Sequence, residues 1–239
     1  MTDGGEPHAG TGDAPSGAAA GAPQRASAAL NPLSVAGRLE YDRVLFFSDA
    51  VFAIAITLLV VDLRVPDIVL SAGHQIYSAR YRILGFAISF LVIGLFWMGH
   101  HRLFRYIAAL DRRLIFLNLL FLGTIAFLPY PTALLFVSST KQPAGPVFYA
   151  ICVAVAGLVE LAIWLYAIWV KGLVPDSVSP SLRRAEIAQL LPTPIVFGLS
   201  IPVAFANPGL APFTWFLLVP IGRIVPRLMR VKGDGPPPS

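Results

Sequence analysis

The sequence predicts an all-α polytopic membrane protein with six transmembrane helices, and three observations support this fold class. Of the 239 residues, 56% are hydrophobic and 13% are charged. The mean hydropathy of +0.71 lies outside the range of ordinary soluble domains. The apolar residues form six long windows, and the basic residues concentrate in alternate connections between those windows.

The apolar windows define the six predicted helices. A helix needs about 20 residues to cross the hydrocarbon core, and the first, third and fourth windows reach that length on their own. The second becomes long enough when it extends through Tyr81 and His100. Prolines interrupt the fifth and sixth, which is tolerated where neighbouring helices satisfy the freed carbonyls. The windows cover residues 44–62, 83–99, 114–137, 147–170, 187–206 and 210–225.

The basic residues predict which side of the membrane each connection faces, because cytoplasmic connections carry an excess of Lys and Arg. With both termini cytoplasmic, all but four of the 18 basic residues fall in inner segments; the exceptions are Arg64, Arg80, Arg82 and Lys141. We therefore expect a multi-pass protein of the cell (plasma) membrane with both termini cytoplasmic. The net charge of +5 then reflects topology and does not predict a nucleic-acid partner.

The two ends of the chain differ in composition from its apolar centre. Residues 1–37 are rich in Gly, Ala, Pro and Ser and contain no apolar run, which predicts a disordered cytoplasmic tail and no signal peptide. Residues 38–230 form the predicted six-helix transmembrane domain, and 231–239 form a flexible C-terminal tail. The single cysteine, Cys152, lies within an apolar window, where a packing role is expected.

Asp49 is the most informative polar residue, because it lies inside the first apolar window. A carboxylate within a membrane helix costs at least about 2.5 kcal/mol, so it indicates a functional or assembly site and needs partners. Polar side chains of the second and third windows lie at a similar depth near the inner boundary. If these side chains come together, their hydrogen-bond donors and acceptors pair with one another inside the protein. The members of this predicted cluster are Arg43, Ser48, Asp49, Trp97, His100 and Asn118.

The predicted cluster permits a packing role or an ion-handling role, but it argues against a metal centre or an enzyme. The adjacent His100 and His101 point in different directions on a helix, unlike the i, i+4 pair of a zinc protease. No further cysteine or carboxylate lies nearby to complete a metal site. Ser48 and Asp49 do not face each other on a helix, so no activated nucleophile is predicted. We expect no cofactor and no catalytic residue.

The first window also carries a face of small and aliphatic residues with one hydroxyl group. On one interpretation this face packs against another helix, and the Thr57 hydroxyl bonds to a backbone carbonyl one turn back. On the other interpretation it lines a pore, in which a ring of Ile54 side chains gates by dewetting and a ring of Thr57 hydroxyls offers oxygens to a cation. Steps of three and four residues trace the face through Ala50, Ile54 (or Ala53), Thr57 and Val61 (or Val60).

Asp62 follows this face at the end of the first window. In an oligomeric pore it would place a ring of negative charge at the outer mouth and concentrate cations there. The alternative is that Asp62 is a solvated helix end beside Arg64.

Several motifs resemble those of a known family. The pattern Arg43-x-x-x-Phe47-Ser48-Asp49, followed by Ala53-Ile54-x-x-Thr57, resembles the first-helix signature of the endosomal and lysosomal potassium channels, specifically their bacterial homologues. The later matches are Trp97-x-x-His100-x-Arg102-Leu103-Phe104, Leu117-Asn118-Leu119 and Phe127-Leu128-Pro129. The resemblance covers roughly residues 38–170 by motif and the rest by helix count.

The resemblance implies a six-helix subunit, four copies of which form a homotetramer around a central pore lined by the first helix. It implies a hydrophobic constriction at Ile54, a hydroxyl layer at Thr57, and a supporting role for Arg43, Phe47, Ser48, Asp49, Trp97, His100 and Asn118. The activity implied is a passive, potassium-preferring leak that also admits other monovalent cations, in a lipid bilayer and without a cofactor.

Two departures from the family pattern qualify this expectation. Animal members place a serine where this chain has Ala53, and the loss of that hydroxyl argues for weaker potassium selectivity. Animal members also carry two six-helix repeats, whereas this chain has one, so a pore requires an oligomer. The filter sequence Thr-Val-Gly-Tyr-Gly is absent, so any selectivity arises in another way.

Two other function classes remain open at this point. In a proton-coupled or ion-coupled transporter, Asp49 and His100 would relay protons or bind the coupling ion. The prolines of the fifth and sixth windows favour this class, whereas the lack of evident internal repeats argues against it. The third class is a non-conducting membrane scaffold, which would retain its function if Ile54 were replaced by a larger residue.

Overall fold

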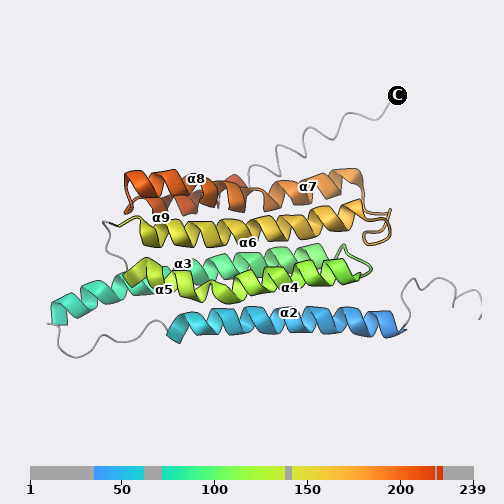
Figure 1. Cartoon of the computed structure of the whole chain (residues 1–239), viewed down its shortest axis with the longest axis horizontal. Coiled ribbons are helices and arrows are strands. Elements are labelled where there is room, and N and C mark those ends of the chain that lie inside the picture. Colours follow the sequence, from blue (N-terminus) through green and yellow to red (C-terminus); the bar gives the residue numbers. More distant parts are fainter. Residues whose placement is uncertain (1–34, 62–71, 138–141, 219, 223–239) are drawn as a thin grey trace, which may run out of the picture.

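The computed structural model describes residues 35–61, 72–137, 142–218 and 220–222, and these residues are almost entirely helical. Successive spans run antiparallel and lie side by side (Figure 1). The elements are α2 Val35–Val61, α3 Ala72–Phe104, α4 Arg112–Phe127, α5 Pro129–Val137, α6 Ala144–Trp169, α7 Pro180–Leu190, α8 Pro192–Ala206, α9 Ala211–Thr214 and the 3-10 helix η2 Trp215–Leu217. The helix α2 begins at Val35, three residues before the predicted domain boundary.

Five helical segments are long and apolar enough to cross a membrane, which confirms the expectation of a multi-span membrane protein. The segments are Gly37–Val61, Ile83–Phe104, Arg112–Leu135, Ala144–Trp169 and Pro180–Ala206. The predicted sixth span corresponds to Ala211–Gly222, which is shorter and runs partly over residues outside the described ones. A sixth span is therefore not confirmed.

Prolines divide two of the spans into consecutive helices. Pro129 has no N–H to continue the ladder of α4, so α4 ends at Phe127 and α5 begins at Pro129. Pro192 separates α7 from α8 in the same way. The fifth span also begins earlier than its apolar window, because the Ser179 hydroxyl caps α7 by accepting a hydrogen bond from the backbone N–H of Leu182 at 3.3 Å.

The connections at one end of the bundle are fastened to each other. The backbone N–H of Ala108 donates to the carbonyl of Leu173 at 2.8 Å and so joins the α3–α4 and α6–α7 connections. Asp111 accepts hydrogen bonds from the backbone N–H of Leu114 at 2.7 Å and from the Tyr166 hydroxyl at 2.6 Å. These bonds hold α4 against the end of α6, at the end of the bundle where the predicted inner basic residues lie.

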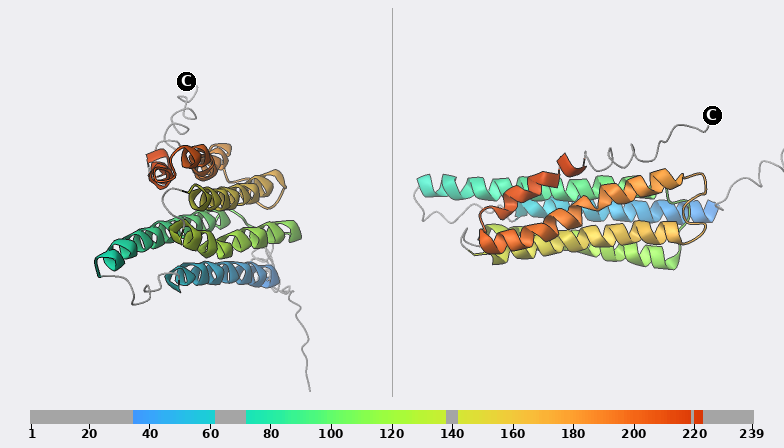
Figure 2. Two further views of the ribbon diagram at one scale, coloured as in Figure 1. Left: turned by 60° about the vertical axis from the view of Figure 1, so that its left-hand side comes forward. Right: turned by 90° about the horizontal axis from the view of Figure 1, so that it is seen from above.

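The helix α6 lies between two layers, with α4 and α5 on one side and α8 on the other (Figures 1 and 2). Gly157 allows α6 and α8 to approach closely: a Cβ at this position would lie 3.0 Å from Cδ of Pro194 and 3.3 Å from its backbone nitrogen. Small residues allow close helix contacts of this kind in membranes. The helix α2 packs against α3, α4 and α5 and lies at one side of the bundle.

Replacing Gly157 by alanine is expected to destabilise the fold by about 1–3 kcal/mol, because the added methyl group must displace the Pro194 backbone. The matched control is Gly123→Ala, since a Cβ at Gly123 meets no atom within 4 Å. Thermal unfolding of the purified protein, followed by the loss of its monodisperse chromatographic peak, measures both variants. Equal midpoints for the two variants would contradict the close α6–α8 contact.

Candidate functional site

The helix α2 has one buried face, and this face holds it against the bundle. Ser48, Phe52, Ala55 and Leu59 recur at steps of four, three and four residues, and each is at most 1% exposed. Their partners come from α3, α4 and α5. The buried stripe fixes the rotation of α2 about its axis and therefore determines which residues face away.

The opposite face of α2 is uncovered in the single chain. Only 22% of its apolar window is buried, compared with 39–44% in the other four spans. Ile54 is 59% exposed, and the exposed residues around it include the whole predicted pore face: Ala50, Ala53, Thr57 and Val61. Arg43 and Phe47 are exposed as well. An uncovered face of this width meets either lipid or another protein surface. The predicted outer-mouth residue Asp62 lies outside the described residues.

The hydroxyl of Thr57 donates a hydrogen bond to the Ile54 carbonyl of its own helix at 2.9 Å. This is the contact expected of a threonine in a membrane helix. Because the proton is directed at the helix, the lone pairs of the oxygen face outward from an exposed side chain. Thr57 can therefore offer an oxygen ligand to a cation while its own donor is satisfied.

A buried chain of hydrogen bonds joins α2, α3 and α4. The amide Nδ2 of Asn118 donates to Ser48 Oγ at 3.1 Å, and Ser48 Oγ donates to the Val44 carbonyl at 2.8 Å. Asn118 Oδ1 lies 2.9 Å from Nε2 of His100. Since Oδ1 is an acceptor only, Nε2 of His100 carries the hydrogen. Ser48, His100 and Asn118 are each at most 2% exposed, so the two bonds between side chains are shielded from solvent.

Aromatic rings enclose the His100 imidazole. Its ring centroid lies 4.3 Å from that of Phe104, 5.8 Å from that of Phe121 and 5.7 Å from that of Phe52. Phe104 lies one turn after His100, and Phe121 lies one turn after Asn118. This spacing was a usable signal in the sequence, but the predicted cluster did not include either ring. The imidazole therefore packs among aromatic rings from α2, α3 and α4.

Asp49 and Trp97 form a separate contact on the exposed side of α2 and α3. The indole Nε1 of Trp97 donates to Asp49 Oδ1 at 2.8 Å, and both residues are exposed in the single chain. The Trp97 ring also stacks on His101 with centroids 5.7 Å apart. Arg43 makes no hydrogen bond or ion pair to this contact among the described residues. The predicted cluster is thus divided into a buried chain and an exposed pair, because Ser48 and Asp49 point to different sides of α2.

Known proteins similar to this chain indicate its family. The family described as "Endosomal/lysosomal potassium channel TMEM175" matches residues 43–129. A potassium channel of Streptomyces collinus is 36% identical over 180 residues, which cover 73% of this chain and 86% of that protein. A potassium channel of Chamaesiphon minutus is 38% identical over 135 residues, which cover 54% of this chain and 66% of that protein.

A solved structure and an animal relative extend the comparison. The crystal structure of a lysosomal potassium-selective channel TMEM175 homologue from Chamaesiphon minutus has a TM-score of 0.61 at 26% identity, with 82% of this chain and 99% of that chain covered. The human endosomal/lysosomal proton channel TMEM175 is 29% identical over 198 residues, and the match covers 80% of this chain but 38% of the human protein. The segment that matches the family contains α3, α4 and the part of α2 from Arg43 onward, which together carry the exposed face, the buried chain and the exposed pair. Together with the Streptomyces relative, this match shows that the chain belongs to the TMEM175 family of potassium channels.

Proposed function

We propose that the chain is a potassium-preferring cation leak channel whose pore is lined by α2 in a homotetramer. The observation that carries the proposal is the uncovered α2 face, which is apolar around Ile54 and presents the Thr57 oxygen beside it. Two relatives that cover 73% and 54% of this chain are named potassium channels. Ions would cross passively along their gradient, with no cofactor and no chemical step.

The proposed pore follows from the order of side chains along α2. A ring of Ile54 side chains forms the hydrophobic constriction, because an apolar collar excludes water and ions until it widens. The Thr57 ring lies one turn further and supplies oxygens that replace water around a cation. Ala50, Ala53 and Val61 line the remaining length, and Asp62 would give the outer mouth a negative charge that attracts K⁺ and other monovalent cations.

A tetramer is proposed because one chain supplies a single pore helix. A closed ring of four copies buries the α2 face of each around one axis. The buried chain of Ser48, Asn118 and His100 would then support α2 from behind, and Asp49, Trp97, Arg43 and Phe47 would lie where neighbouring elements meet. The supporting role of Ser48, His100 and Asn118 rests on their burial and their hydrogen bonds. That of Asp49 and Trp97 rests on the bond between them, and that of Arg43 and Phe47 rests on the family motif.

The membrane arrangement is also a proposal. Both termini would be cytoplasmic in the cell membrane, with the basic α3–α4 and α6–α7 connections on the inner side. Five spans would leave the two termini on opposite sides, so this arrangement requires the sixth span at residues 210–225. The proposed transmembrane domain covers residues 38–230, between the N-terminal tail of residues 1–37 and the tail of residues 231–239.

The proposal is tested by ion flux through the purified protein in liposomes under a potassium gradient. Passive potassium efflux that depends on the protein, that proceeds without a second gradient and that exceeds sodium flux is the expected result. Proton flux is measured in parallel, since the human relative is named a proton channel. No potassium flux from a confirmed tetramer would overturn the proposal.

A coupled transporter is the alternative that uses Asp49 and His100. Slow, saturable flux with a steep pH dependence that disappears in Asp49→Asn would favour it. The contacts argue against a direct relay between the two residues, because Asp49 bonds to Trp97 while His100 bonds to Asn118.

Replacing Asp49 by alanine is expected to reduce the yield of tetramer more than the flux of each tetramer that forms. The Trp97 indole would lose its charged acceptor, and with it a hydrogen bond worth about 1.5–3 kcal/mol. Asp49→Asn keeps an acceptor oxygen and serves as the matched control. Chromatography with light scattering measures the yield, and a normal yield of tetramer from Asp49→Ala would count against the supporting role.

A further inference from the structure

A second carboxylate lies inside an apolar span, far from the α2 face. Glu160 of α6 is 4% exposed, and its Oε1 atom has no hydrogen-bond partner among the described residues. A buried carboxylate oxygen without a donor is costly, and the cost falls when a cation or a hydrogen-bond donor reaches the oxygen. Glu160 shares the sequence signal of Asp49, an acidic residue within an apolar window, although it is not among the predicted site residues.

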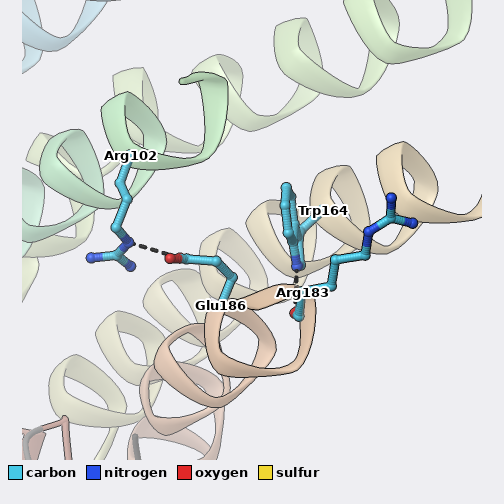
Figure 3. A network of polar contacts seen from close by, with 4 residues as sticks. All are labelled: Arg102, Trp164, Arg183 and Glu186. Atoms are coloured by element: carbon cyan, nitrogen blue, oxygen red, sulfur yellow. Dashed lines mark hydrogen bonds and ion pairs between the residues drawn. The ribbon is translucent and has the colours of Figure 1, made fainter. Parts of the chain in front are cut away.

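The surroundings of Glu160 keep a space open for this oxygen. Oε1 lies against α3 at Gly99, where a Cβ would be only 2.5 Å away. Arg102 follows Gly99 by three residues and lies on the same face of α3. The Nε of Arg102 donates to Oε2 of Glu186 at 2.8 Å, while the indole of Trp164 donates to the Arg183 carbonyl at 3.1 Å and holds α7 against α6 (Figure 3).

A cavity of about 330 Å³ is lined in part by Glu160 and Arg102. Arg102, Glu160 and Gln189 are among its polar lining residues, and Leu95, Met98 and Leu218 are among its apolar ones. Leu95 is 48% exposed and Met98 is 51% exposed, so the cavity opens beside an apolar surface of α3. A ligand that enters here needs a polar end for the interior and an apolar part for the mouth.

The charges define the polar end of this ligand. Glu186 is neutralised by Arg102, whereas Glu160 retains an unpaired oxygen that suits a cationic donor. The guanidinium group of Arg102 has further N–H donors beyond Nε, which suit an anionic oxygen. An acceptor for a cation and donors for an anion thus line the same cavity. A group carrying both charges, an ammonium and a phosphate, matches this pair.

We propose that this cavity binds the headgroup of an aminophospholipid, with its primary ammonium on Glu160 and its phosphate on Arg102. The acyl chains would lie along the apolar mouth at Leu95 and Met98. Gly99 lies five residues before the end of α3, about 7–8 Å along the helix axis, which matches the depth of the boundary between headgroups and acyl chains. The mouth residues Leu95 and Met98 are about half exposed in the single chain, and the site would face lipid if the proposed α2 pore is correct.

The test is native mass spectrometry of the purified full-length protein with three added lipids that share the same acyl chains. Phosphatidylethanolamine has a phosphate and an ammonium group with N–H donors. Phosphatidylcholine has a phosphate and a cation without N–H donors, and phosphatidylglycerol has a phosphate but no cation. We expect half-maximal binding of phosphatidylethanolamine at a concentration about tenfold lower than for the other two. We also expect that Glu160→Gln abolishes this preference, and that the exposed control Asp176→Asn preserves it.

A second variant tests the site without altering its charges. Leu95→Trp narrows the mouth at a half-exposed position, where the fold tolerates a larger side chain, and it should remove the same preference. Equal binding of the three lipids by the parent protein, or a preference that persists in Glu160→Gln and Leu95→Trp, would overturn the proposal. The measurement does not use ion flux, so its failure is distinguishable from a failure of the proposed channel.

Discussion

Replacing Ile54 by asparagine is expected to raise potassium flux by about tenfold or more and to relax discrimination against sodium. Ile54 is the bulky aliphatic residue on the uncovered α2 face and is 59% exposed in the single chain. In a tetrameric pore, four asparagine amides would hydrate the collar and remove the dewetting barrier. A barrier lowered by about 1.4 kcal/mol is enough for a tenfold increase in rate.

The measurement compares parent and Ile54→Asn protein in liposomes, first under a potassium gradient and then under a sodium gradient. Leu199→Asn is the matched control, since Leu199 is 66% exposed on α8, away from α2, and the substitution also puts an asparagine on an apolar surface. Flux from the control should equal that of the parent. If Ile54→Asn conducts no better than the parent, the constriction is not at Ile54.

Replacing Asn118 by leucine is expected to destabilise the protein by about 1–3 kcal/mol and to lower its unfolding midpoint by about 5 °C. Asn118 accepts from Nε2 of His100 and donates to Ser48, and a leucine of similar size does neither. The Ser48 hydroxyl keeps its bond to the Val44 carbonyl, but the His100 donor is left buried among aromatic rings without an acceptor. Thermal unfolding in detergent measures the loss.

A double variant isolates the unpaired donor as the cause. His100→Phe combined with Asn118→Leu replaces both polar partners by apolar groups of similar shape, which can be nearly neutral where a single replacement is costly. The new ring would lie against Phe52, Phe104 and Phe121, where the imidazole now packs. We expect the double variant to recover most of the stability lost in Asn118→Leu. A double variant that is less stable than the single one would indicate that the polar chain itself is needed.

Several features of the fold were predictable because they depend on residues that are close in sequence. Long apolar windows identify spans by hydropathy alone, and the five helices that can cross a membrane coincide with the first five windows. The α2 faces were also predictable in outline, since a period of three and four residues separates Ser48, Phe52 and Ala55 from Ala50, Ile54 and Thr57. Asp49 signalled a polar site through its cost in a membrane.

The hydrogen-bond partners of these side chains were not predictable from the sequence in the same way. The sequence grouped Ser48 and Asp49 in one cluster with Arg43, but adjacent residues on α2 point to different sides, so one joins Asn118 and the other joins Trp97. The helix boundaries also shifted: the Ser179 cap moves the start of the fifth span to Pro180, and Pro129 divides the third. Such outcomes depend on how far each helix is rotated and displaced relative to its neighbours.

The sequence by itself determined the class of protein, the positions of five spans and the family motifs of α2, because hydropathy and helical periodicity are properties of one segment at a time. Only the tertiary structure decided that α2 is uncovered around Ile54, that Asn118 links Ser48 to His100, and that Glu160 faces a cavity beside Arg102. Contacts between helices depend on the relative rotation, depth and separation of residues from different spans. Those three quantities become defined only when the spans pack.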